Sequence, residues 1–187
     1  CFSYETVVIG GLSALDLNPL TKDLTTGTGT VGDPYVLSFR YTLEAGDPDG
    51  DYDVVIQVDD DATNSSTNND AGDIDFSIDN TAPVISNLNV TSASCLNNGT
   101  DKLTFTFNVV EEGCGTFTDE DLTVVTGLTD TTPNITQTGD GTSSVPYLFT
   151  YTYDVSGEAD GEKTITVDAT DDQGNVASTL TATDAFR

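Results

Sequence analysis

Apolar and polar residues alternate along several short stretches of this chain, and this period of two constrains the fold more than any other feature. The pattern is clear in residues 102–110, 147–155 and 163–169. In the first of these, the apolar positions are Leu103, Phe105, Phe107 and Val109. Successive side chains of a β-strand point to opposite faces, so each stretch predicts a strand with one buried face.

Turns rich in Gly and Asp separate these stretches at short spacing, which is typical of an all-β sandwich. We find no stretch with a convincing helical period of 3.6 residues. In the C-terminal part the pattern predicts seven strands, at residues 84–91, 102–110, 121–126, 134–138, 146–155, 163–170 and 176–183.

The chain also repeats itself, because residues 33–62 resemble residues 145–173 at an offset of 112 residues. The alignment matches five alternating apolar or aromatic positions of the first segment, Tyr35, Leu37, Phe39, Tyr41 and Leu43, with Tyr147, Phe149, Tyr151, Tyr153 and Val155 of the second. Upstream, "YETVVIGGLS" from Tyr4 corresponds to "DEDLTVVTGLT" from Asp119.

The repeat predicts two modules, residues 1–80 and 81–187. We expect the second to be complete and the first to begin at its third strand. Two explanations stay open: the sequence is a window on a longer repetitive chain, or strands of a partner subunit complete the first module.

The charge of the chain limits its partners. It carries 32 acidic and 5 basic residues, a formal net charge of -27. Nucleic acids and anionic membrane surfaces repel such a polyanion, whereas bound metal ions or a saline environment suit it. A merely solvated acidic surface is the alternative. No apolar run approaches the roughly 18 residues of a membrane span, so we expect no membrane insertion.

Catalytic signatures are absent from the sequence. There is no His, which is the commonest general base and a common transition-metal ligand. We find no Ser-based, Cys-based or phosphate-loop motif. The sequence therefore predicts a protein that is not an enzyme.

Three segments resemble bacterial immunoglobulin-like repeats of large surface proteins: "LTFTFNVVEEGCGTFTDEDLTVVTGLT", "KTITVDATDDQGNVAS" and the linker "IDNTAPVI". The resemblance implies tandem immunoglobulin-like Greek-key β-sandwiches, secreted to the cell surface and strung into stalks, filaments, adhesins or surface layers. Calcium often stiffens such rods. The partners it implies are neighbouring modules or further copies of the chain, arranged head to tail.

The chain departs from the usual repeat in its cysteines and in the insertion "TNSSTNNDA", residues 63–71. Loops on rigid scaffolds often carry recognition. The alternative function is therefore a ligand-binding adhesin module that uses loop 63–71 to contact a glycan or a host protein. A third, an accessory domain of a secreted hydrolase, has no support in the residues.

Acidic loops predict a metal site at the junction of the modules. If successive strands alternate in direction, loops 44–53, 111–115 and 171–175 converge beside the linker. The candidate ligands are Asp47, Asp49, Asp51, Asp53, Asp79, Asn80, Glu111, Glu112, Asp171, Asp172 and Asn175. Calcium takes 6–8 oxygen ligands in flexible geometry, which suits this set. A hydrated acidic turn is the alternative.

A second possible metal cluster involves loops expected to face a preceding or a following module. Its residues are Asp59, Asp60, Asp61, Asp73, Asp75, Glu158 and Asp160.

Three cysteines leave one over if a pair forms. Cys95 and Cys114 lie beyond opposite ends of a nine-residue strand, about 30 Å long at 3.3 Å per residue. A disulfide needs Cα atoms within about 7 Å. We therefore expect disulfides between modules or subunits, with Cys95 pairing to the residue that Cys1 represents in the next module. Free thiols and a lipid-modified Cys1 stay open.

Four sequons of the N-x-Ser/Thr type mark possible glycosylation, if the source organism glycosylates. They begin at Asn64, Asn89, Asn98 and Asn134.

Overall fold

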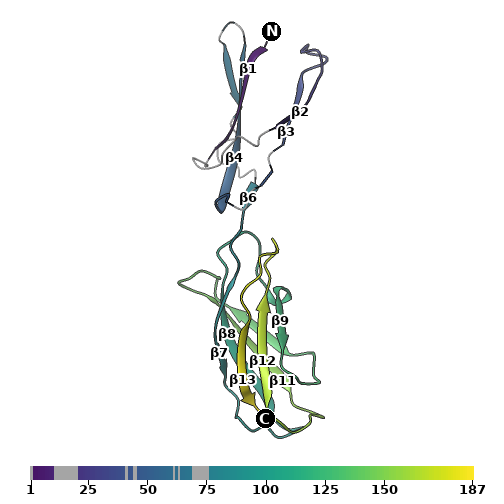
Figure 1. Ribbon diagram of the computed structural model, residues 1–187, viewed down its shortest axis with the longest axis vertical. Helices are drawn as coiled ribbons and strands as arrows, with labels where there is room; N and C mark the ends of the chain where they lie inside the picture. Colours follow the sequence, from purple (N-terminus) through teal and green to yellow (C-terminus); the bar gives the residue numbers. More distant parts are fainter. Residues whose placement is uncertain are drawn as a thin grey trace. The chain divides into compact units, whose positions relative to one another are not determined.

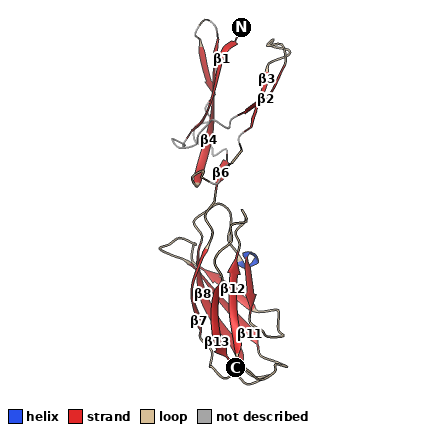
Figure 2. Ribbon diagram, viewed as in Figure 1, coloured by secondary structure: helices blue, strands red, loops and turns tan. Residues whose placement is uncertain are grey.

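Short alternating segments form the strands of the computed structural model, and turns rich in Gly and Asp join them (Figures 1 and 2). The structure describes residues 2–10, 21–40, 42–43, 46–60, 62, 64–68 and 76–187. Over these residues the chain is all-β with open sheets, apart from one 3₁₀ turn, η1 at Asp119–Asp121. No helix in the described ranges is long and apolar enough to cross a membrane.

The chain divides into two compact units, residues 1–80 and 81–187. The second unit contains two antiparallel sheets. The four-stranded sheet has the order β10 (Asn134–Thr138), β11 (Tyr147–Asp154), β8 (Lys102–Val110) and β7 (Val84–Val90). The three-stranded sheet has the order β13 (Leu180–Phe186), β12 (Lys163–Ala169) and β9 (Leu122–Val125).

The core of the second unit comes from the apolar positions of the alternating strands. Phe105 and Phe107 on β8 are fully buried, as is Ile165 on β12 of the other sheet. Burying a side chain of this size stabilises the fold by about 1.5–3 kcal/mol. Because one cluster contains residues of both sheets, the arrangement is consistent with a β-sandwich.

Aromatic pairs across β8 and β11 add to this core. Phe105 lies opposite Tyr151 and Phe107 opposite Phe149, and each pair of rings is stacked with centroids 5.5 Å apart. Such pairs contribute about 0.5–1.5 kcal/mol beyond the area they bury. They also pin the register, since a slip of one residue would turn every ring to the outer face.

Six of the seven predicted strands are confirmed to within one residue at each end, but the last prediction is wrong. The final strand is β13, Leu180–Phe186, and not residues 176–183. Val176 makes only an isolated bridge to Thr170, and its side chain is 66% exposed. The turn after β12 still occupies this segment, so ladder pairing starts later, at Leu180 opposite Val167.

The first unit contains two groups of paired strands among its described residues. β1 (Phe2–Gly10), β5 (Ser65–Asn68) and β6 (Phe76–Ile78) all pair with β4 (Gly50–Asp60). β2 (Thr21–Thr26) pairs with β3 (Val36–Arg40). The expectation of a loop at residues 63–71 is thus partly wrong, because four of these residues form β5. Residues 63 and 69–71 lie outside the described part.

The internal repeat reappears in the geometry of two hairpins. Thr26 pairs with Val36 in the first unit, and Thr138 pairs with Leu148, 112 residues later, in the second. Gly27 and Gly139 both have positive φ, 88° and 94°. A Cβ at either would lie 2.0–2.1 Å from the carbonyl oxygen of the proline that precedes the next strand. The β2–β3 hairpin therefore corresponds to the β10–β11 hairpin.

Candidate metal site

An acidic turn leads into β4 of the first unit, and its carboxylates engage the residues around β6. Asp49 Oδ1 accepts the backbone N–H of Asn80 at 2.7 Å, and the Asp47 carbonyl accepts Asn80 Nδ2 at 2.9 Å. Asp51 Oδ1 accepts the hydroxyl of Ser77 at 2.6 Å. The turn predicted as a metal loop is therefore held against the strand that leads to the linker.

Gly50 and Tyr52 explain why this turn is tight. Gly50 has φ of 146°, a conformation that side-chain-bearing residues rarely adopt. Tyr52 is buried, and its hydroxyl donates to the carbonyl of Pro48. Burial, and after it the charges of Asp47 and Asp49, raise the pKa of the Tyr52 phenol. The phenol thus stays a neutral donor that closes the turn.

The loop after β12 in the second unit folds around one buried carboxylate. Asp171 is 7% exposed, and its Oδ1 accepts the N–H groups of Gln173 and Asn175 at 2.9 and 2.8 Å. Its Oδ2 accepts the Asn175 side-chain amide at 2.9 Å. Asp side chains commonly bond main-chain N–H groups one turn ahead in this way. The loop is ordered by its own residues.

The neighbouring loop, between β8 and η1, carries two further candidate ligands. Glu111 Oε1 accepts the N–H of Gly113 at 2.7 Å, and its Oε2 is buried. Glu112 Oε1 accepts the N–H of Ser143 at 2.6 Å, and hydrogen bonds from Ser143 lower the pKa of this carboxyl. Glu112 therefore points to the β10–β11 turn.

Gly115 brings this loop close to the loop after β12. Its φ is 109°, and a Cβ built there would lie 2.7 Å from Oδ2 of Asp172. The same oxygen accepts the N–H of Thr116 at 3.4 Å. The absence of a side chain at residue 115 is thus what allows the two loops to meet.

Two carboxylates of the second unit form the candidate metal group. One carboxylate oxygen of Glu111 and one of Asp171 lie within 4.8 Å of each other. Asp79, another predicted ligand, belongs to the first unit and is buried. Like charges at such separations repel, and a cation offsets the repulsion. The donors are all oxygens, which fits a hard cation such as calcium and not a metal that needs His or Cys.

The remaining predicted ligands lie in both units. Asp47 and Asp49 belong to the turn before β4, Asp51 and the half-buried Asp53 lie on β4, and Asn80 follows β6. Asp172 and Asn175 belong to the loop of Asp171, whereas Glu112 is engaged elsewhere.

The second predicted cluster is only partly described. Asp59 and Asp60 are at the end of β4, and Asp61, Asp73 and Asp75 lie outside the described residues. Asp160 is exposed.

Glu158 has partners within the second unit. Its Oε1 accepts the N–H and the hydroxyl of Thr129, both at 2.6 Å, and Oε2 lies 3.9 Å from Lys163 Nζ. The bonds from Thr129, followed by the charge of Lys163, lower the pKa of this carboxyl. Glu158 therefore ties the β11–β12 loop to the segment after β9.

Asp130 is a structural carboxylate that was not among the residues predicted from the sequence. Its Oδ1 accepts the N–H and hydroxyl of Thr132, both at 2.9 Å, and its Oδ2 accepts the N–H of Asp154 at 3.0 Å. Asp140 binds Thr142 in the same manner. The signal available in the sequence was the spacing Asp-x-Thr within a turn, which favours such local bonds.

The described cysteines, Cys95 and Cys114, are both thiols, the first exposed and the second half-buried. Arg187 Nε donates to Cys95 Sγ at 3.3 Å. This hydrogen bond, followed by the charge of Arg187, lowers the pKa of the Cys95 thiol. Cys1 lies outside the described residues, so pairing between modules stays a prediction.

All four sequon asparagines are exposed. Asn98 already has a structural role, because its Oδ1 accepts the N–H of Gly157 at 2.6 Å and its Nδ2 donates to the Glu158 carbonyl at 2.9 Å. Asn64, Asn89 and Asn134 are the better candidates for a glycan, since a bulky group at Asn98 would disturb these two bonds.

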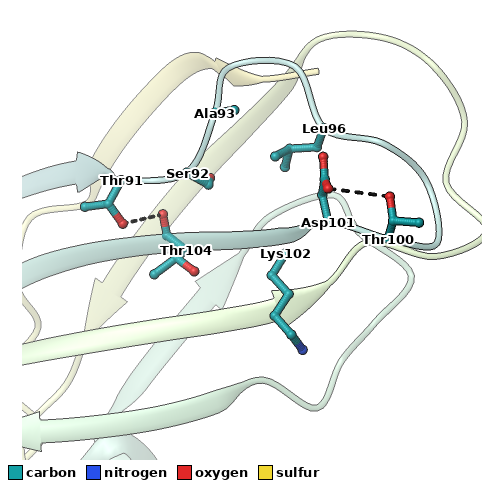
Figure 3. Close-up of a pocket in the computed structure, with 8 residues that line it drawn as sticks. All are labelled: Thr91, Ser92, Ala93, Leu96, Thr100, Asp101, Lys102 and Thr104. Carbon is teal, nitrogen blue, oxygen red and sulfur yellow. Dashed lines mark hydrogen bonds between the residues drawn. The ribbon is translucent and has the colours of Figure 1, made fainter.

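An open cavity of about 610 Å³ lies beside the loop between β7 and β8 (Figure 3). Its lining residues are Thr91, Ser92, Ala93, Leu96, Thr100, Asp101, Lys102 and Thr104. Thr91 Oγ1 donates to the Thr104 carbonyl, and Lys102 Nζ lies 2.5 Å from Asp154, away from Asp101. Ser92 Oγ, which also belongs to the lining, is buried without a hydrogen-bond partner.

Comparison of the chain with family models, with curated proteins and with solved structures gave no match.

Proposed function

We propose that this chain is an extracellular structural or adhesive repeat protein. In this proposal it consists of tandem immunoglobulin-like modules, and calcium bound by the acidic loops stiffens a stalk, filament or surface layer. The modules associate with neighbouring modules or further copies, head to tail, and catalyse no reaction.

The strand order of the second unit is the observation that carries the proposal. In constant-type immunoglobulin domains, the first, second, fifth and fourth strands form one sheet, and the third, sixth and seventh form the other. Counted from β7, the sheets β7-β8-β11-β10 and β9-β12-β13 have this order. The repeated hairpin at an offset of 112 residues supports a tandem arrangement.

The acidic loops support the calcium part of the proposal. Carboxylate oxygens of Glu111 and Asp171 lie within 4.8 Å of each other, in a chain with a net charge of -27. An ion that binds only the folded state stabilises it by about 2.7 kcal/mol at a concentration one hundred times its Kd. Calcium would thus stabilise the loops that hold these side chains.

Thermal unfolding of the whole chain tests the calcium sites. We expect calcium to raise the melting temperature by several degrees over EDTA, and sodium at equal ionic strength to have little effect. Asp171→Asn should reduce the calcium-dependent rise, whereas the exposed control Asp160→Asn should keep it. Equal melting temperatures with calcium and EDTA would remove calcium from the proposal and leave hydrated acidic loops.

A ligand-binding adhesin is the second candidate function, and the β4–β5 hairpin favours it. Residues 64–67 expose amide and hydroxyl side chains at this hairpin. Replacing Ser66 and Thr67 by Ala keeps the strand and removes its hydroxyl groups. Lost adhesion to a glycan-coated surface with unchanged assembly would favour this candidate, and unchanged adhesion would exclude it.

A further inference from the structure

The loop between β7 and β8 of the second unit contains the only Asn-Gly pair of the sequence, Asn98–Gly99. Such a pair is chemically labile, because the main-chain nitrogen of the second residue can attack the side-chain amide carbon of the first. A glycine in the second position has no Cβ to hinder this attack and gives the main chain the freedom to reach the required geometry.

Hydrogen bonds hold both reacting groups of this pair. The Gly99 N–H, whose nitrogen is the nucleophile, donates to the carbonyl of Val155. Asn98 Oδ1 accepts the N–H of Gly157 at 2.6 Å, and Asn98 Nδ2 donates to the carbonyl of Glu158 at 2.9 Å. A bonded nucleophile and a fixed amide cannot meet, so the reaction has to wait until the turn leaves residues 155–158, which we call the docking segment.

We propose that Asn98 is a deamidation site gated by the docking segment, and that its conversion prevents the β7–β8 loop from docking again. Gly99 N forms a bond to Asn98 Cγ, the Cγ–Nδ2 bond breaks, and the amide leaves as ammonia with the proton of the main-chain N–H. Water then opens the cyclic succinimide to aspartate or isoaspartate. The proposal goes beyond the proposed function and depends neither on calcium nor on association between modules.

Both products lose the contacts that dock the loop. In aspartate, an oxygen replaces Nδ2 and faces the Glu158 carbonyl, so a donor is lost and two acceptors oppose each other. In isoaspartate the main chain runs through the side-chain carbons and gains a methylene group, which displaces Gly99 from Val155. Leu96 of the same loop packs against the core, so release of the loop uncovers one end of it.

The Glu158 side chain offers a way to loosen the docking segment without changing Asn98 or Gly99. Its Oε1 accepts both the N–H and the hydroxyl of Thr129, and these bonds tie the docking segment to the residues after β9. Glu158→Ala removes this attachment. Glu120→Ala, at an exposed position of η1, is the matched control.

Mass spectrometry of peptides from the whole chain, incubated at neutral pH, measures the conversion of Asn98. In the folded chain it should be about tenfold or more slower than in the same chain unfolded in urea, because a hydrogen-bonded turn reacts only on opening. Glu158→Ala should speed the conversion several-fold in the folded chain, together with hydrogen exchange at the amides of Gly99 and Gly157. Glu120→Ala should change neither rate.

The proposal is overturned if folded and unfolded chains deamidate at the same rate, or if the rate does not follow the exchange of these two amides. The deamidated chain, separated by its additional negative charge, tests the second half of the proposal. Its Gly157 amide should exchange about tenfold faster than in the unmodified chain, since the acceptor that held it has moved. Asn98→Asp should show the same change in the absence of isoaspartate, and unchanged exchange in both proteins would overturn the loss of docking.

Discussion

The Asp171 carboxylate accepts the Asn175 side-chain amide at 2.9 Å and so closes the loop after β12. The same carboxylate also accepts two main-chain N–H groups of the loop. These bonds hold Asp171 within the candidate metal group whether or not an ion is bound. The hydrogen bonds of Asp171 should therefore stabilise the fold even without a metal ion, and this contribution can be measured separately from metal binding.

Replacing Asp171 by Ala should destabilise the chain by about 1–3 kcal/mol in EDTA, because the N–H groups of Gln173 and Asn175 and the Asn175 side-chain amide lose their common acceptor. Urea unfolding measures the change. Asp160→Ala, at an exposed loop position, should change stability by less than about 0.5 kcal/mol. Equal effects of the two substitutions would show that the bonds of Asp171 contribute little.

Replacing Gly139 by Ala should destabilise the second unit by about 2–3 kcal/mol. The new Cβ would lie 2.1 Å from the carbonyl oxygen of Pro146, at a φ of 94°. Gly157 provides the control, because its φ is 74° but no atom lies within 4 Å of the Cβ position. Gly157→Ala should cost only the backbone strain, about 1 kcal/mol. If both variants unfold at the same urea concentration, the short distance between the Cβ position of residue 139 and the Pro146 carbonyl oxygen does not affect stability.

The stability difference between the wild type and Asp130→Asn should depend on pH. Hydrogen bonds from Thr132, and then from Asp154, lower the pKa of Asp130 below its ordinary 3.8. A lowered folded-state pKa stabilises the fold above the ordinary value and loses that effect as pH falls through the folded value. The wild type should therefore be the more stable above about pH 4, and the difference should shrink towards pH 2. The urea midpoints of the two proteins, measured across this pH range, give the stability difference. A difference that does not change with pH would contradict the prediction.

Alkylation of Cys95 should be faster at pH 7 in the wild type than in Arg187→Gln. Arg187 lowers the pKa of this thiol and so raises the thiolate fraction, and the thiolate is the reactive species. Above about pH 10 the two rates should converge, because the thiol is then ionised in both proteins. Mass spectrometry with iodoacetamide measures the rates, with Cys114 as the internal reference. A constant ratio of rates at all pH values would indicate a change of access instead.

Strand positions in the second unit could be predicted because the apolar alternation is local. Phe105 and Phe107 must lie on one face of any strand that contains them, whatever surrounds it. The start of β13 could not be predicted in this way. Val176 continues an alternating pattern, yet the loop closed by Asp171 keeps it out of the ladder.

The sequence allowed the acidic loops of the candidate metal site to be predicted, but not which of their carboxylates come close together. Glu111, Glu112 and Asp172 are equivalent in the sequence, as acidic residues in turns. In the structure Glu112 turns to Ser143, whereas Glu111 joins Asp171. The choice depends on which N–H groups each carboxylate meets, and these belong to segments distant in the chain.

By itself, the sequence determined that the chain is all-β, where most strands lie and that a hairpin recurs after 112 residues, because side-chain period and turn chemistry are local properties. Only the tertiary structure decided which carboxylates gather and which are held by main-chain donors. Those outcomes depend on contacts between distant segments, and no local pattern encodes them.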